Sequence, residues 1–228
     1  IYEWERMDKK DITLGTLRYF ASIDDPEKYA EFKKEQSSNY VKKALDGSHN
    51  DIAKIMYSEY GNEFVCASIS GKSWYQFRDH KWEEIEEGIF LREKISEDIV
   101  YKYTDIGKEL FGDLGNPADK AEEAMHKARL KQVQKLITNL KSAPYKNNVM
   151  REAMEVFYDR RFKQKLDQNT HIIGFKNGAY DLQINEFRPG RPEDFISKTL
   201  PIDFREYNEC DEEVQNVKDF LLKVFPDE

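Results

Sequence analysis

Residues 171–200 read HIIGFKNGAYDLQINEFRPGRPEDFISKTL, the only long β-patterned segment in a mostly helical and heavily charged chain. Asn177-Gly178 is expected to form a tight hairpin turn, because Asn and Gly tolerate the positive φ that such a turn requires. Gln183–Asn185 is expected to turn the chain again. The following Pro-Gly-Arg-Pro run ends a strand, since proline donates no hydrogen bond to a neighbouring strand. The segment predicts a β-meander near residues 172–198, with strands at Ile172–Phe175, Ala179–Leu182, Glu186–Arg188 and Phe195–Lys198.

The rest of the chain carries helical patterns and one further hairpin. Asp24-Asp25-Pro26 is expected to begin the second of two short helices in residues 12–36, because Asp caps helices and Pro fits the first turn. Metal binding by the two carboxylates is the alternative, but capping accounts for the pair. Apolar spacing predicts further helices from a cap at Ser48 or Asn50 to Gly61, over Ile89–Phe111, from Pro117 to before Pro144, over about Asn147–Leu166, and from about Asp211 onward.

The hairpin is expected from strands at Phe64–Ile69 and Trp74–Phe77, joined by a turn at residues 70–73. With the meander and the helices it predicts a helix-dominated α+β fold: a helical bundle, one small hairpin near residues 64–78 and a meander near residues 172–198. A hairpin after a helix is also compatible with a winged-helix unit that has Lys72 at the tip of its wing. The simpler alternative is a hairpin that only covers the helix.

The composition indicates a soluble, non-secreted protein. The chain has 228 residues, 35% of them charged, and a formal net charge of −8. Its two cysteines, Cys66 and Cys210, lie far apart in no metal or redox spacing, which favours a reducing compartment over a disulfide framework. No apolar run approaches the roughly 20 residues of a membrane span, and no signal peptide is recognisable.

The charge is unevenly distributed, because residues 126–165 hold eleven Lys or Arg against three acids. One interpretation is a solvated helix face whose last cations favour the negative end of the helix dipole. The other is a track for nucleic-acid phosphates, whose binding would depend steeply on salt. The second interpretation makes the following residues candidate nucleic-acid contacts: Lys72, Arg129, Lys131, Lys135, Arg160, Arg161, Lys163 and Lys165.

No catalytic, cofactor-binding or metal-binding residue is predicted within the chain. Gly71-Lys72-Ser73 resembles the end of a phosphate-binding loop, but Cys66 stands where that loop needs glycine, and a strand rather than a helix is expected to follow. The four histidines have no ligand spacing, and no hydrolase or zinc motif is found.

Two blocks of sequence carry a resemblance to a known family. GFKNGAYDL and EFRPGRPEDFISK, within residues 174–198, resemble the segment before the helicase motor in poxvirus-type primase–helicases of large DNA viruses and in related phage proteins. A second block, comprising HNDIAK, FVCAS and KSWYQFRDHKW within residues 49–82, is similar to the region just upstream in that family.

The resemblance implies a non-catalytic linker region of a replicative primase–helicase, and we expect the chain to be a piece of a longer polypeptide. Residues 1–47 would end the accessory region of the primase, 48–170 would form a helical pre-helicase domain, 171–205 the meander, and 206–228 a helix that leads into the helicase collar. The parent protein would be a hexameric superfamily 3 AAA+ motor that uses ATP and Mg²⁺.

The expected partners are single-stranded or forked DNA and the protein's own primase and helicase domains, with no membrane. Replication would take place in the host cytoplasm or nucleus. The alternative is a free-standing DNA-binding or scaffolding accessory protein without enzymatic activity.

Overall fold

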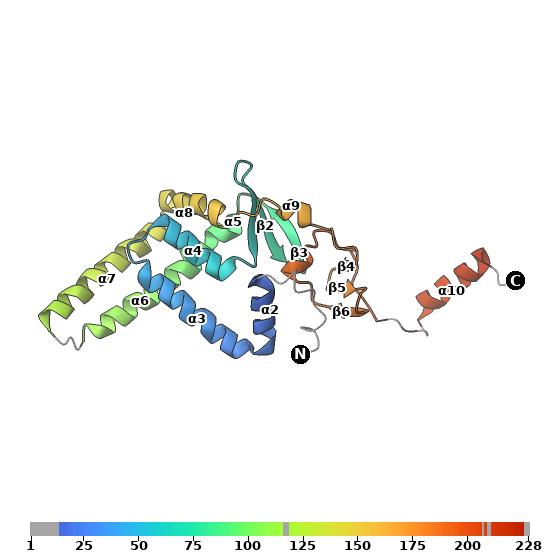
Figure 1. Ribbon diagram of the computed structural model, residues 1–228, viewed down its shortest axis with the longest axis horizontal. Helices are drawn as coiled ribbons and strands as arrows, with labels where there is room; N and C mark the ends of the chain where they lie inside the picture. Colours follow the sequence, from blue (N-terminus) through green and yellow to red (C-terminus); the bar gives the residue numbers. More distant parts are fainter. Residues whose placement is uncertain (1–13, 116–118, 207, 209–210, 226–228) are drawn as a thin grey trace.

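The computed structural model describes residues 14–115, 119–206, 208 and 211–225. Helices dominate, and two three-stranded antiparallel sheets lie beside them (Figure 1). The helices are α2 (Leu14–Asp24), α3 (Pro26–Lys43), α4 (His49–Tyr60), α5 (Ile89–Lys94), α6 (Val100–Asp113), α7 (Lys120–Leu140), α8 (Ala143–Val156), α9 (Phe162–Lys165) and α10 (Glu212–Val224). The strands are β1 (Phe64–Ser68), β2 (Ser73–Arg78), β3 (Lys81–Ile85), β4 (Ile172–Phe175), β5 (Gly178–Asp181) and β6 (Glu186–Arg188). The predicted helix-dominated α+β class is confirmed.

Helix starts follow the capping residues. The Asp25 carboxylate accepts a hydrogen bond from Lys28 N at 3.0 Å, and Pro26 occupies the first turn of α3. Ser48 caps α4 in the same way, through the Asp51 amide. These caps satisfy amide groups that have no partner within the helix. The predicted capping role of Asp25 is therefore confirmed, although α3 continues to Lys43, beyond the predicted end at residue 36.

The predicted helix over Ile89–Phe111 contains a π-helical turn at Ile95–Ile99, between α5 and α6. The apolar residues Leu91, Ile95, Ile99 and Tyr103 follow one another at intervals of four. In a regular α-helix each such interval drifts by about 40° around the axis, because one turn takes 3.6 residues. The π turn closes i to i+5 bonds and takes up more residues. All four side chains therefore stay in the core.

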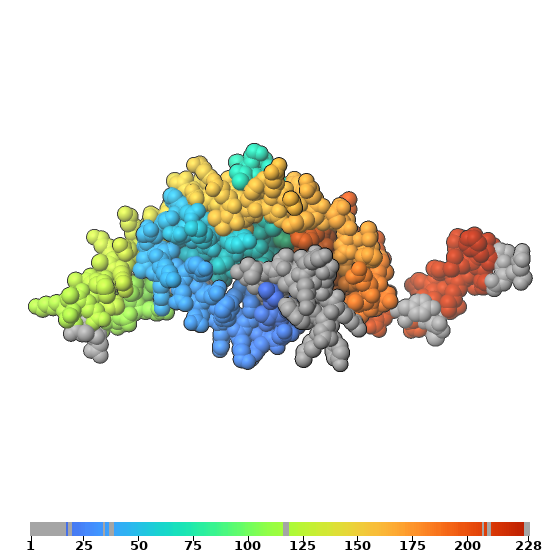
Figure 2. Space-filling model, viewed as in Figure 1, coloured from blue at the N-terminus to red at the C-terminus, as the bar shows by residue number. Residues whose placement is uncertain are grey.

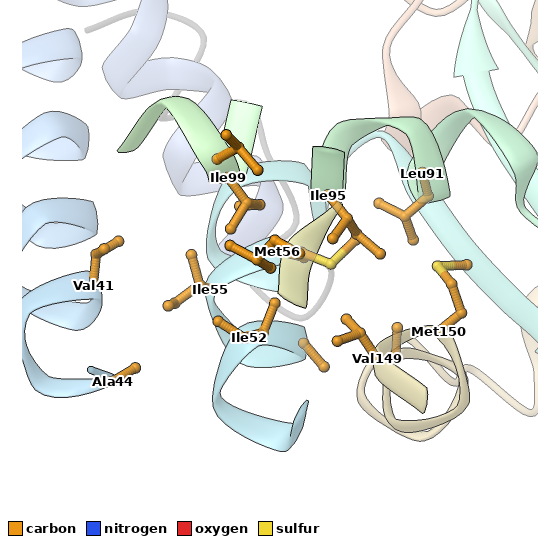
Figure 3. Packing of buried hydrophobic residues seen from close by; sticks show 14 of the residues in the cluster. Val41, Ala44, Ile52, Ile55, Met56, Leu91, Ile95, Ile99, Val149 and Met150 are labelled. Carbon is orange, nitrogen blue, oxygen red and sulfur yellow. The ribbon is translucent and has the colours of Figure 1, made fainter. Parts of the chain in front are cut away.

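The main core lies where α3, α4, the α5–α6 helix and α8 meet. Figure 3 shows Ile52, Ile55 and Met56 of α4 between Ile95 and Ile99 on one side and Val149 of α8 on another. Val41 and Ala44 close the cluster from α3. α7 packs along α6 and contributes Val133, Leu136 and Leu140 to the same cluster.

The first sheet has the order β1-β2-β3, whereas the sequence predicts only a two-stranded hairpin. Asp79 and His80 form the tight turn between β2 and β3 with φ of 48° and 66°. Positive φ at both central positions is the geometry that joins hairpin strands directly, and Gly or Asn usually supplies it. Neither residue is Gly or Asn here, which is why the sequence pattern did not reveal β3.

The predicted helix over about Asn147–Leu166 is wrong at both ends. α8 begins at Ala143 and stops at Val156, because the next residues pair with the free edge of β1. Cys66 N donates to Phe157 O at 3.0 Å and Asp159 N donates to Cys66 O at 3.1 Å. This pairing gives hydrogen-bond partners to backbone N–H and C=O groups of β1 that would otherwise have none. Residues Arg160–Lys165 consequently lie beyond α8, so their predicted place at the end of that helix is wrong. Lys163 and Lys165 nevertheless lie in the last turn of the short helix α9.

The second sheet has the order β4-β5-β6, as the meander predicts. Phe175 pairs with Gly178, which places the turn at Lys176-Asn177, one residue before the predicted position. Asn177 instead uses its side-chain amide to exchange two hydrogen bonds with the backbone of Phe204, at 3.1 and 2.8 Å.

The predicted fourth strand at Phe195–Lys198 is wrong, because this segment bonds to several partners and forms no ladder. Ile196 O accepts from Trp82 N in the first sheet, whereas Leu200 N donates to Gly174 O in the second.

Asp167, which follows α9, accepts hydrogen bonds from residues 197 and 198. These bonds make a pH-dependent contribution to stability. Its carboxylate accepts from Ser197 N at 2.7 Å and from Lys198 N at 3.3 Å. Burial alone would raise the pKa of Asp167, but the hydrogen bonds from Ser197 and Lys198 outweigh it and lower the pKa.

A lowered folded-state pKa stabilises the fold above the unfolded value of about 3.9, and this contribution is lost as the pH falls through the folded value. Asp167→Asn is expected to reduce the free energy of unfolding by about 1 kcal/mol at neutral pH. The difference should shrink below about pH 4 in urea titrations of both proteins. A constant difference down to about pH 2 would contradict this role.

Candidate nucleic-acid interface

The candidate cations of α7 are Arg129, Lys131 and Lys135, and all three are exposed. They lie outside the buried positions of α7, since an amphipathic helix keeps its charges on the solvent side. Within the described residues, none of the three forms an ion pair. We call these three residues the α7 group.

A second set, the α9 group, consists of Arg160, Arg161, Lys163 and Lys165. Lys165 Nζ lies 2.7 Å from Asp159 Oδ2. Lys163 Nζ lies 3.6 Å from Glu84 Oε1 and 5.5 Å from the centre of the Tyr75 ring. The side chains of Arg160 and Arg161 are exposed and form no ion pair with any residue that the structure describes.

The acidic neighbours of the α9 group weaken its positive potential only in part. The pKa of Glu84 is lowered, chiefly by the hydrogen bond from Ser73 and also by Lys163. Exposed ion pairs of this kind contribute only about 0 to 1 kcal/mol. A phosphate can therefore replace the carboxylate partner of Lys163 at small cost.

The two groups are separated in space, although the sequence presents them as one basic region. In Figure 1, α8 lies between α7 and α9. Its 14 residues correspond to about 21 Å at 1.5 Å per residue. That length exceeds the screening distance of about 8 Å at physiological salt, so the groups act as independent patches.

Lys72 belongs to neither group. It lies at the projecting turn between β1 and β2 (Figure 1) with φ of 48°, and its Nζ lies 2.9 Å from Glu87 Oε1. Ser73 begins strand β2 and not a helix, as predicted for this turn. Nucleic-acid contact by Lys72 stays a prediction.

A cleft of about 600 Å³ beside this turn brings Lys72 together with Arg92 of α5 and Arg151 of α8. Trp74 and Met150 form part of its apolar wall. Arg92 and Arg151 are not among the predicted contact residues, because three separate elements meet here and no linear spacing signals their approach. Glu86 and Glu87 share the cleft, so its charge is mixed.

Two further features concern metal binding and the membrane. Within the described ranges no three His, Cys, Asp or Glu side chains gather where they could hold a metal ion. None of the described helices combines the length and the apolar character needed to cross a bilayer.

The fold and the surface define a class: a helix-dominated α+β module that carries separate cationic patches. The chain belongs to the family described as D5 N terminal like, whose model matches residues 53–226.

Relatives of the chain occur in several large DNA viruses. It is 38% identical over 98% of its length to a protein of Acanthamoeba polyphaga mimivirus named "Putative helicase", and 31% identical over 87% to a Frog virus 3 protein with the same designation. A protein of African swine fever virus named "Putative primase" is 26% identical over 78% of the chain.

The chain spans only 20 to 23% of the length of these relatives. The family match and the relatives confirm the resemblance to primase–helicases of large DNA viruses on which the sequence interpretation rested.

Proposed function

We propose that this chain is the non-catalytic region of a viral replicative primase–helicase that couples the primase to an ATP-driven, hexameric unwinding motor and contacts DNA. The observation that supports it most is the family match over residues 53–226, together with relatives whose names include both helicase and primase. ATP and Mg²⁺ would act in the motor. The site of action would be the host cytoplasm or nucleus, where the viral genome is copied.

The exposed face of α10 supports the coupling role. The apolar residues Val217, Phe220, Leu221 and Val224 recur at helical spacing, and each remains about half exposed. α10 stands apart from the rest of the described chain (Figure 2). An exposed apolar face of this kind marks an interaction surface. We propose that it docks on the helicase collar, and that the predicted boundaries near residues 47, 170 and 205 separate the units of the linker.

DNA contact is supported by the exposed cations of the α7 and α9 groups on a protein of net charge −8. On an acidic protein, local basic patches bind phosphates, whereas the rest of the surface repels them. A single strand or a fork is the proposed ligand.

Reversal of the α9 group tests this contact. The triple change Arg160→Glu, Arg161→Glu and Lys163→Glu is expected to weaken single-stranded DNA binding. It should also flatten the slope of log affinity against log salt by about 2, since each single-strand phosphate contact contributes about 0.7. Fluorescence anisotropy over a salt series measures both quantities.

Reversal of the exposed Lys42, Lys54 and Lys108 is the control with the same charge change. An unchanged slope in the Arg160–Lys163 variant would leave only the solvated-face interpretation.

The coupling role has a separate test in the gene. A Gly-x-x-x-x-Gly-Lys-Ser/Thr motif encoded after residue 228, placed behind a predicted strand, would support an attached motor. A stop codon directly after residue 228 would favour the free-standing accessory protein.

A further inference from the structure

A second cleft, of about 350 Å³, opens where the end of α4, the first sheet and the segment after α8 meet. Aromatic rings dominate its wall. Phe157, Trp82 and Phe162 are buried at its base, and the rings of Tyr57 and Tyr158, 43% and 44% exposed, line it as well. We call it the aromatic cleft. Its size suits one small planar ligand, for which exposed rings provide stacking surfaces.

Three polar side chains, Asn62, Asp159 and Glu193, also line the aromatic cleft, and Glu193 has an acceptor without a partner in the described part of the chain. Its Oε2 is buried and, among the described residues, has no hydrogen-bond donor. Burial raises the pKa of this carboxyl group, and the charge of Asp194 acts in the same direction. A buried acceptor without a donor is costly, so a ligand that brings an N–H group to Oε2 gains affinity there.

Cations lie on the chain directly after the cleft. Arg160 and Arg161 follow Tyr158 by two and three residues, and both are exposed. Stacking rings next to exposed guanidinium groups is the combination by which proteins hold single-stranded nucleic acid, since every base has a π face and every nucleotide a phosphate.

We propose that the aromatic cleft holds one unpaired base of a single DNA strand, stacked on Tyr158 and donating its exocyclic amino group to Glu193, while Arg160 and Arg161 bind the flanking phosphates. This inference rests on the proposed DNA contact and names the ligand of that contact. Cytosine, adenine and guanine carry such an amino group. Unpaired thymine has only its ring N3–H, which lies between two carbonyl oxygens that repel a carboxylate. The cleft should therefore discriminate against thymine.

The test measures the affinity of the whole 228-residue chain for three single strands of equal length, about twelve nucleotides. One strand is oligo-dC, one is oligo-dT, and one carries abasic sites. Fluorescence anisotropy is expected to show about tenfold tighter binding of oligo-dC than of oligo-dT, with the abasic strand bound most weakly.

Two substitutions separate stacking from hydrogen bonding. Tyr158→Ala should weaken oligo-dC binding about tenfold and leave the salt slope unchanged, because stacking releases no counterions. Glu193→Gln should abolish the preference for dC over dT, since the amide can also donate to thymine. Tyr101→Ala and Glu186→Gln make the same changes at exposed positions outside the lining of the aromatic cleft and should alter neither quantity. Thermal melting confirms that each variant is folded.

The outcomes distinguish the two proposals. Equal affinity for all three strands with a normal salt slope would overturn the base-binding role, favour a peptide as occupant of the cleft, and leave the DNA contact intact. A Glu193→Gln variant that keeps the full preference for dC would likewise overturn the base-binding role and leave the DNA contact intact. Absence of binding to every strand at low salt would overturn both proposals.

Discussion

Replacing Arg188 with methionine is expected to lower the free energy of unfolding by about 3 to 5 kcal/mol, because it leaves buried carboxylates without a counter-charge. The side chain of Arg188 is only 13% exposed. Its two Nη atoms donate to both oxygens of Asp194 at 2.8 and 2.7 Å, and Nη2 also lies 3.3 Å from Asp181 Oδ2.

The two carboxylates outweigh the cost of burying the Arg188 guanidinium. Burial by itself lowers the pKa of this guanidinium, yet Asp194 and Asp181 outweigh it, and the pKa is raised. Asp194 is in turn held by the amide of Arg191 at 2.7 Å. Arg188 thus links β6, β5 and the 3₁₀ turn at Pro192–Asp194.

Denaturant titrations measure the loss in the free energy of unfolding. The comparison requires that the slope of this free energy against denaturant concentration is the same in both proteins. Arg160→Met removes an exposed arginine and should change stability by no more than about 0.5 kcal/mol. Arg188→Lys keeps the charge but loses the bidentate geometry. Its loss of stability should lie between those of Arg160→Met and Arg188→Met. A loss below about 1 kcal/mol in Arg188→Met would show that the carboxylates find other donors.

Trp82→Ala is expected to cost about 3 to 5 kcal/mol, the range for removing a large buried aromatic side chain. Trp82 is 3% exposed, and its ring packs edge-on to Phe162 with centroids 4.9 Å apart. Its indole Nε1 donates to Pro192 O at 2.8 Å. Trp82 therefore connects the first sheet to the segment that leads out of the second.

Trp82→Phe separates packing from hydrogen bonding. Phenylalanine keeps most of the ring but leaves Pro192 O without its donor, at a cost of about 1 to 3 kcal/mol. Thermal and urea unfolding of both variants, with Tyr101→Ala as the exposed aromatic control, provide the comparison. If Trp82→Phe were as damaging as Trp82→Ala, the hydrogen bond and not the packing would dominate.

The sequence by itself determined the helix-dominated α+β class, the cap at Asp25, and the three strands of the second sheet. It narrowed the cap of α4 to Ser48 or Asn50, and the structure has Ser48. These features depend on residues within a few positions of one another. A cap bonds an amide three residues on, and proline ends a strand where it stands. Local chemistry of this kind can be read from a linear pattern. The resemblance to viral primase–helicases likewise rested on contiguous blocks.

The tertiary structure alone decided where α8 ends, how the basic residues divide into two groups, and that Glu193 lies among aromatic rings. Each depends on partners far apart in the sequence: Cys66 with Phe157 and Asp159, or Trp82 with Pro192, 110 residues later. The open edge of β1 takes residues 157–159 because its backbone groups need partners, and this overrides the helical pattern of the segment. No local propensity contains that information, since the edge exists only once the sheet has formed.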